Sequence, residues 1–376
     1  MNTPFCRLVG VDFPLVAFSH CRDVVVAVSK AGGFGVLGAT TFTPAQLKVE
    51  LDWIDAHIGG KPYGIDLAIA ENMPVKGETS QTFYSIMSRI SDRHYSFTNN
   101  LLDTRGVSPI SARSELDNEA VGYMHDTAED LMEEAFRHPI RLIVNALGRP
   151  PQSMIDRGRK YNVPVGALVG SKEHAIRQIE AGVNVLIAQG TEAAAHCGEV
   201  TTMVLVPEVV SATKKYGDIP VLAAGGIVTG RQMAAALTMG ADGVWTGTVW
   251  LPTLESELSQ AMREKYIAAT SRDTVRSRSM SGKAARLLRT DWTAAWEQPE
   301  APEYLQMPFQ SLLANAAQKS VEKSVAGGNA NAVPLLTYAV GQGVGMLSSI
   351  KSAKAVVQEF KEDFILAAER MTTILE

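Results

Sequence analysis

The sequence predicts a (β/α)₈ TIM barrel, and three observations point to that fold class. Short apolar runs alternate with amphipathic stretches along most of the 376 residues. Each run is apolar on both of its faces, which is typical of parallel strands covered by helices. Eight such runs can be counted, and eight strands close this barrel. An open, doubly wound parallel sheet is the alternative fold.

The predicted strands fall into two groups. The first group is 13–18, 33–39 and 62–70, and the second is 140–147, 163–169, 183–189, 219–226 and 242–247. Amphipathic segments between them predict helices at 23–32, 43–59, 151–161, 171–182 and 230–240. Thr43 and Pro44 give a clear helix start, because threonine caps a helix and proline is favoured at its first position.

A polar segment separates the two groups of strands. Residues 71–135 are interrupted by Gly and Pro and show weak helical periodicity only from about 126 to 137. We interpret them as an insertion after the third strand that lies over the barrel. We therefore expect a barrel over 1–275 that includes this insertion. A helical C-terminal extension over 276–376, ending in an apolar helix at 354–375, would then pack over the barrel.

Composition excludes several classes of function. The net charge is -5 and no basic stripe is visible, so we expect no nucleic-acid partner. No apolar run is long enough for a membrane span, and the first residues lack a signal-peptide pattern, so we expect a cytoplasmic protein. The three cysteines are too few and too scattered for a disulfide framework or a zinc site, and we expect no metal.

Two glycine-rich loops follow the seventh and eighth predicted strands, where barrels of this type often bind phosphate. Gly225 and Gly226 precede a helix, and their backbone amides can approach an anion aided by the helix dipole. Gly247 and Thr248 add a close backbone approach and a hydroxyl. These loops predict a phosphate site; the alternative is two tight turns that hold nothing.

His196 lies in the loop after the sixth predicted strand, within "AQGTEAAAHCGEV". Its neighbours are small, which suits a planar ring packed against backbone. A neutral imidazole can accept a proton near neutral pH. We therefore predict a catalytic base at the same rim as the phosphate loops; the alternative is a histidine that satisfies a loop carbonyl.

Three segments then identify a family. "KAGGFGVLGA", "AQGTEAAAHCGEV" and "PVLAAGGIVTGRQMAAALTMGADGVWTGTVWL" resemble the nitronate monooxygenases, with a weaker match in "GQGVGMLSS". The resemblance implies an FMN-dependent barrel enzyme that oxidises nitronates or nitroalkanes with O₂ to a carbonyl compound and nitrite. It places His196 on the family's catalytic base.

The resemblance also implies a set of cofactor-binding residues. Gly226 and the run from Trp245 to Thr248 would hold the FMN phosphate, and Gln189 would contact the ring or ribityl region. The full set is Ala17, Phe18, Ser19, Asp66, Gln189, Gly190, Ala194, Gly225, Gly226, Trp245, Thr246, Gly247 and Thr248.

This chain departs from the family pattern at three places. Ala194 and Ala195 stand where the family has glycines, and Asp66 stands where it has asparagine. A carboxylate there cannot donate a hydrogen bond, whereas an amide can. His20 lies near the family's proline-methionine-glycine turn, so it is either a second polar group at the flavin or a surface or helix-cap residue.

Several alternatives stay open. The same motifs resemble flavin-dependent enoyl-thioester reductases, which take hydride from NAD(P)H and act on acyl-carrier or coenzyme A substrates. The basic stretch with Arg276, Arg278, Lys283, Arg286 and Arg289 would contact a nucleotide or pantetheine phosphate, or else form a solvated helix face. Glu192 either orients the imidazole or caps a helix. The final helix could also pack against a second copy, giving a homodimer.

Overall fold

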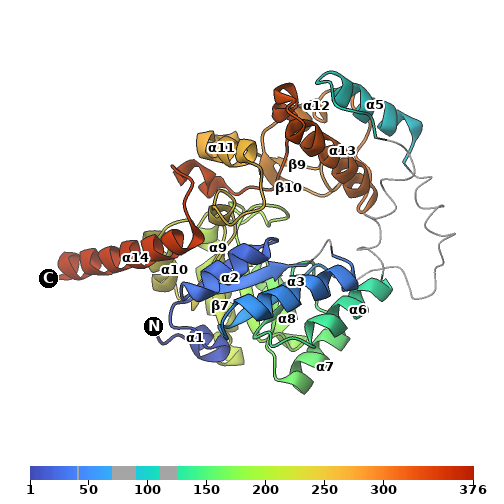
Figure 1. Ribbon diagram of the computed structural model, residues 1–376. Helices are drawn as coiled ribbons and strands as arrows, with labels where there is room; N and C mark the ends of the chain where they lie inside the picture. Colours follow the sequence, from blue (N-terminus) through green and yellow to red (C-terminus); the bar gives the residue numbers. More distant parts are fainter. Residues whose placement is uncertain (40–41, 70–89, 111–124) are drawn as a thin grey trace.

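The computed structural model describes residues 1–39, 42–69, 90–110 and 125–376. Eight parallel strands follow one another around a closed barrel, and β8 pairs back with β1 (Figure 1). This closure confirms the predicted fold class and excludes the open sheet. The strands are β1 (Leu15–Ser19), β2 (Phe34–Gly38), β3 (Tyr63–Leu67), β4 (Ile143–Asn145), β5 (Val165–Val169), β6 (Val185–Gln189), β7 (Val221–Ala224) and β8 (Gly243–Thr246).

Helices cover the outside of the barrel. They are α2 (Arg22–Lys30), α3 (Pro44–His57), α6 (His125–Ala135), α7 (Gln152–Tyr161), α8 (Lys172–Glu180), α9 (Thr202–Thr213) and α10 (Gly230–Thr238). The predicted start of α3 is confirmed, because Thr43 forms a capping box with Gln46 and Pro44 occupies the first turn. α1 (Pro4–Val9) closes the N-terminal end of the barrel, where Phe5 packs edge-on against Phe34 at 5.9 Å.

Side chains alternate between two cores, as the two-residue period of a strand requires. One set packs between strands and helices and includes Ala17, Ile65 and Leu67. The other set fills the barrel and includes Val36, Val144, Ile187, Leu222 and Trp245. The inward positions nearest the C-terminal ends of the strands face the C-terminal end of the barrel, which we call the mouth.

A third apolar cluster, separate from the two cores of the barrel, lies beyond the mouth. Its elements are α5 (Asp92–Asp103), α11 (Gln260–Ala268), β9 (Thr274–Ser277), β10 (Ala285–Leu288), α12 (Asp291–Ala295) and α13 (Phe309–Ala326). Buried side chains such as Leu102, Trp292 and Leu313 join α5 to the C-terminal segments, and α12 and α13 lie beside α5 in Figure 1. The predicted insertion is thus split, because α6 packs against α3 on the barrel wall instead. Residues 71–89 and 111–124 of that insertion lie outside the described residues.

The basic stretch of the tail differs from its helical interpretation. Residues 274–288 form an antiparallel hairpin of β9 and β10, in which Arg276 and Arg286 are directly paired. The alternative that this stretch forms a solvated helix face was therefore wrong for Arg276 and Arg286. The final helix α14 (Ala353–Leu375) packs against α10 and α2 with its first half, and it projects away from the barrel in Figure 1.

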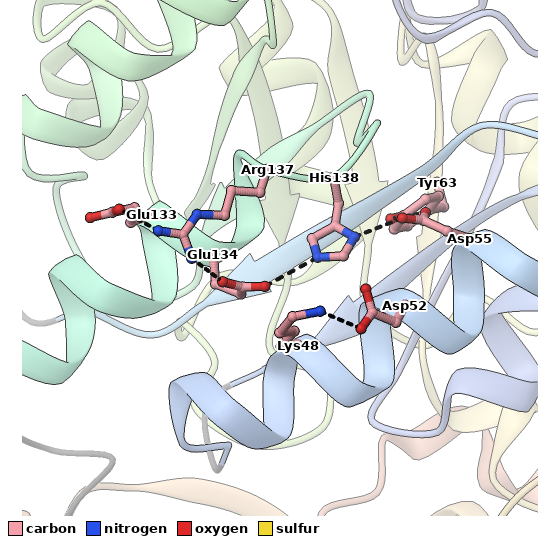
Figure 2. A network of polar contacts seen from close by, with 8 residues as sticks. All are labelled: Lys48, Asp52, Asp55, Tyr63, Glu133, Glu134, Arg137 and His138. Carbon is pink, nitrogen blue, oxygen red and sulfur yellow. Dashed lines mark hydrogen bonds and ion pairs between the residues drawn. The ribbon is translucent and has the colours of Figure 1, made fainter.

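A polar network fixes the N-terminal end of the barrel (Figure 2). His138, which is buried between α6 and β4, contacts Asp55 through Nδ1 at 2.6 Å and Glu134 through Nε2 at 3.4 Å. Tyr63 donates to the other oxygen of Asp55 at 2.7 Å, and Arg137 pairs with Glu134 at 2.7 Å. Within the described chain no helix is long and apolar enough to cross a membrane.

Candidate active site at the barrel mouth

The floor of the mouth is formed by inward-facing side chains at the ends of the strands. Phe18 stacks on Trp245 with ring centroids 6.0 Å apart and an interplanar angle of 26°. Gly38, Asp66 and Gln189 occupy the corresponding inward positions on β2, β3 and β6 by the alternation along each strand. Trp245 is a buried member of the barrel core, so the floor is both apolar and rigid.

The glycine turn after β7 adopts backbone conformations that favour glycine. Gly225 and Gly226 have φ angles of 113° and 70°. The first N–H groups of α10 are already engaged, because Arg231 N donates to Asp363 of α14 at 2.7 Å and Gln232 N donates to Thr229. The N–H groups that remain for a ligand therefore lie in the glycine turn rather than at the start of the helix.

The turn after β8 has open space above it. Among the described residues, apart from the two chain neighbours of Gly247, no atom lies within 4 Å of the position that a Cβ on Gly247 would take. The N–H groups of Gly226 and Gly247 have no hydrogen-bond partner among the described residues. Partly exposed, unpaired N–H groups on two adjacent loops are suited to bind an anion.

The threonines of the β8 turn have different roles. The Thr246 hydroxyl donates to Val16 O at 2.7 Å and accepts from Trp250 Nε1 at 2.9 Å, so it ties β8 to β1. The Thr248 hydroxyl accepts from Gly341 N at 2.9 Å and keeps its own hydrogen available. Only Thr248 therefore retains a donor for a ligand.

The loop that carries His196 is held in an uncommon conformation. Ala195 has a φ of 56°, in the left-handed region that glycine occupies without strain. Two backbone hydrogen bonds fix it to β10, from Ala195 N to Arg286 O at 3.1 Å and from Arg286 N to Ala195 O at 2.7 Å. The hairpin thus imposes the turn that glycine would otherwise favour.

Arg286 also holds this loop through its side chain, which is only 7% exposed. Its Nε donates to Thr191 O at 2.9 Å, and its Nη1 donates to Thr274 Oγ1 at 3.0 Å. Arg286 therefore contacts the His196 loop from both main chain and side chain, which identifies it as a positioning residue.

His196 presents a neutral imidazole at the mouth. Burial lowers its pKa, the hydrogen bond to the Ala284 backbone opposes that effect, and nearby Lys283 lowers the pKa further. Because a carbonyl only accepts, the ring nitrogen facing Ala284 carries the hydrogen and the other is the acceptor. His196 can therefore both donate to a backbone carbonyl and act as a base, because each role uses a different ring nitrogen.

Glu192 and Thr202 join the His196 loop to the glycine turn. The Glu192 carboxylate accepts from Thr202 N at 2.9 Å, at the first residue of α9, so its role is helix capping. The Thr202 hydroxyl reaches Gly225 O at 3.1 Å, and Gly190 N donates to Ala224 O at 2.9 Å. The two loops are thus contiguous.

Asp66 is a buried acid without a counter-charge. It is 3% exposed, and its Oδ1 has no hydrogen-bond partner in the described chain. Burial raises the pKa of this carboxyl well above its ordinary value, which favours the protonated, uncharged form. A carboxylate at this position could not donate a hydrogen bond, whereas the protonated form that burial favours has an O–H that can donate.

The other predicted cofactor residues differ in how they face the mouth. The side chain of Ala17 packs outward among the helices, so only its backbone can contact a ligand. The Ser19 hydroxyl accepts from Cys21 N at 3.1 Å. Gly190 packs tightly against Thr202, and a Cβ there would lie 2.2 Å from its Oγ1.

A glycine segment of the tail contributes to the site and was missed by sequence reasoning. Gly341 N binds Thr248, and Gln342 N donates to Glu192 O at 2.9 Å. A Cβ on Gly343 would lie 3.0 Å from Gly226 O, and one on Gly341 would lie 3.3 Å from Ala194 N. The segment therefore contacts the loops after β6, β7 and β8 together. The available signal was the alternate glycines of "GQGVG".

These features define a class: a TIM-barrel protein with two glycine turns that carry unpaired N–H groups and a partly buried imidazole at one mouth. The nitronate monooxygenase family model matches residues 14–363, and the chain belongs to that family. It is an oxidoreductase. Within the described chain, no group of acidic, histidine or cysteine side chains is arranged to hold a metal ion.

Two relatives extend this comparison. Rv1533 of Mycobacterium tuberculosis, which carries a provisional monooxygenase name, is 46% identical over 97% of both chains. A Staphylococcus aureus protein with a provisional nitronate monooxygenase name is 26% identical, covering 84% of this chain and 85% of its own.

Solved structures share the fold. Nitroalkane oxidase from Streptomyces ansochromogenes matches with a TM-score of 0.78 and 22% identity, over 98% of this chain and 99% of that one. FabK from Thermotoga maritima matches with a TM-score of 0.71 and 24% identity, over 100% of this chain and 99% of that one.

Proposed function

We propose that the protein binds FMN at the mouth and oxidises nitronates or nitroalkanes with O₂ to a carbonyl compound and nitrite, with His196 as the base. One observation carries the proposal. The unpaired N–H groups of Gly226 and Gly247 lie on loops contiguous with the loop of a neutral, partly buried imidazole. Membership of the nitronate monooxygenase family supports the same reaction.

The residues present fit a phosphorylated flavin. The open space above Gly247 and the two free N–H groups suit a phosphate. Phe18 and Trp245 offer an apolar floor, while Asp66 and Gln189 offer polar groups to the polar edge of a flavin ring. A bound flavin would supply the electron acceptor and the reaction with O₂.

In the proposed reaction, the protein's own residues remove a proton from the substrate. The acceptor nitrogen of His196 would remove the hydrogen on the carbon next to the nitro group, and the electron pair of that bond would stay on the nitronate. The Ala284 backbone holds the opposite ring nitrogen, which sets the direction of the acceptor lone pair. Arg286 and its bonds to Ala195 and Thr191 hold the loop that carries this ring.

His196→Asn tests the role of the base. We expect the variant to retain bound FMN and to lose about 10²–10⁴ in turnover of neutral nitroalkane, the usual contribution of a positioned base. Turnover of a preformed nitronate should change little, because its proton is already gone. Initial rates of nitrite release with both substrates measure this difference. Equal loss with both substrates, or no loss with either, would remove the base role.

The pH dependence gives a second readout of the same group. Since burial lowers the pKa of His196 from 6.5, its neutral form predominates at pH 7. In the wild type, kcat/KM for nitroalkane should be constant near neutrality and fall as the pH drops through that lowered pKa. The fall should be absent with preformed nitronate.

A second candidate, an NAD(P)H-dependent enoyl-thioester reductase, is favoured by the basic hairpin beside the mouth. Arg276 and Arg278 lie on or next to β9, and Lys283 lies within electrostatic reach of His196. Anaerobic bleaching of the flavin by NAD(P)H would support the reductase. Nitrite release from alkyl nitronate in air without NAD(P)H would support the monooxygenase.

A further inference from the structure

His20 occupies a built position at the edge of the mouth. Its ring lies edge-on to Phe18 with centroids 5.1 Å apart, and Phe18 in turn stacks on Trp245 of the floor. It follows the last residue of β1, whereas His196 follows β6, so the two imidazoles approach the mouth from different walls. The base role assigned to His196 leaves His20 without a function.

Gly38 makes room for this ring and also binds it. A Cβ on Gly38 would lie 2.7 Å from Cζ of Phe18 and 2.8 Å from both Cε1 and Nδ1 of His20, closer than real contacts allow. The Gly38 carbonyl lies 2.9 Å from His20 Nδ1. Any larger residue at 38 would displace both rings.

That carbonyl determines which ring nitrogen faces the mouth as an acceptor. Since a carbonyl only accepts, Nδ1 of a neutral His20 must carry the hydrogen, and Nε2 then holds the lone pair. Nε2 has no hydrogen-bond partner among the described residues, and the residue retains solvent-exposed surface although many protein atoms surround its ring. His20 therefore presents an oriented and accessible acceptor.

The electrostatic surroundings keep this acceptor available. Burial among the surrounding protein atoms lowers the pKa of His20, while the Gly38 carbonyl and the more distant Glu257 oppose that effect. Burial raises the pKa of the adjacent Cys21 thiol and that of the Asp66 carboxyl on β3, which favours the uncharged form of both groups. Exposed Glu257 is thus the charged group that faces His20 within the described chain, and the ring is neutral at pH 7.

We propose that His20 is a specificity-determining residue whose Nε2 accepts a hydrogen bond from a hydroxyl group of the substrate, away from the reacting carbon. The ring next to it, Phe18, and the Trp245 ring beneath offer only apolar contact to a substrate chain. A substrate with a hydroxyl at that place would satisfy Nε2, and an alkyl group would remove its water without replacement. The catalytic part of this inference rests on the proposed function, but the binding part does not.

Matched substrates test the inference. The pairs are 3-nitropropan-1-ol with 1-nitrobutane and 2-nitroethanol with 1-nitropropane, in which a hydroxyl replaces a methyl group. For at least one pair, His20→Phe should reduce the kcat/KM preference for the hydroxyl member about tenfold relative to the wild type, through KM. Comparing ratios removes the intrinsic difference in acidity between the two substrates.

His57→Phe is the matched control. His57 also has its Nδ1 on a backbone carbonyl, that of Trp53 at 2.7 Å, and its ring also stacks on an aromatic side chain, but it lies at the end of α3, outside the mouth. Its preference ratios should equal those of the wild type. Unchanged ratios in His20→Phe would overturn the proposal. An equal fall in kcat for both members of each pair, together with a changed acidic limb of the pH–rate profile, would show that His20 acts as a base. That result would also overturn the proposal.

A binding measurement separates this inference from the proposed function. In wild-type protein with ¹⁵N-labelled histidine, the Nε2 resonance of His20 is assigned by its loss in His20→Phe or His20→Gln. Saturation with at least one of the two nitroalcohols should move it in the direction of a hydrogen-bonded acceptor, and the matching nitroalkane should not. If no nitro compound is oxidised, the proposed function fails while this shift can still occur. If neither nitroalcohol gives a selective shift, the inference fails.

Discussion

The two ends of the barrel treat histidine in opposite ways. At the N-terminal end, both ring nitrogens of His138 contact carboxylates, and Arg137 and Tyr63 complete the network (Figure 2). At the mouth, His20 and His196 each use one nitrogen on a backbone carbonyl and have no described partner for the other.

The same difference extends to other polar groups of the mouth. Asp66 has an unpaired oxygen, and the N–H groups of Gly226 and Gly247 are free within the described chain. Buried polar groups are normally hydrogen-bonded, because leaving them unpaired costs free energy. Groups paired within the protein stabilise the fold, whereas the unpaired groups of the mouth are free to pair with a ligand.

The largest effect is expected for a substitution in the mouth that weakens FMN binding. Gly247→Asp would place a carboxylate in the open space beside the proposed phosphate, and like charges brought together cost several kcal/mol. We expect FMN affinity to fall by at least about 100-fold. Gly247→Ala adds only a Cβ to open space and should stay within a few-fold of the wild type. Flavin fluorescence titration of the apoprotein measures both, and equal affinities of Gly247→Asp and wild type would contradict the phosphate site.

An intermediate effect is expected at the opposite end. His138→Leu would leave buried Glu134 and half-buried Asp55 without their imidazole partner, so the free energy of unfolding should fall by about 1–3 kcal/mol. Turnover of the folded enzyme should be unchanged. Urea unfolding measures the expected loss of stability, and nitrite assays measure the expected unchanged turnover, with exposed His57→Leu as the control. A fall in kcat at unchanged stability would show that the two ends are not separate in function.

The smallest effect is expected at Ala195. Glycine adopts its φ of 56° without strain but loses more freedom on folding, so Ala195→Gly should change the free energy of unfolding by no more than about 1 kcal/mol. Ala195→Val should destabilise the protein by more, because a β-branched side chain is strained there. Urea unfolding of the two variants decides this. A large loss on Ala195→Gly would show that the methyl group packs in the mouth rather than merely being tolerated.

Local patterns predicted the barrel well, for physical reasons. Strands buried on both faces give continuous apolar runs, and the start of α3 follows from Thr43 and Pro44. The placement of His196 and the glycine turns at one rim followed from the rule that parallel strands all end on the same side.

What sequence reasoning missed depends on contacts between distant segments. Arg286 becomes buried and forms its backbone hydrogen bonds with Ala195 only when the hairpin packs against the loop after β6. The raised pKa of Asp66 depends on how completely the fold surrounds it, which no local pattern reports. The role of Gly341 likewise required the tail to return to the mouth.

That return has a consequence for how the enzyme matures. Because Gly341 binds Thr248 and Gln342 binds Glu192, the tail links the turn after β8 to the His196 loop only after a segment far downstream of β8 has been synthesised. A ribosome-bound chain that stops after the last barrel strand would have all its strands but a loose rim. If the proposed FMN site is correct, nascent chains should take up the vitamin-derived group only once this glycine segment has left the exit tunnel.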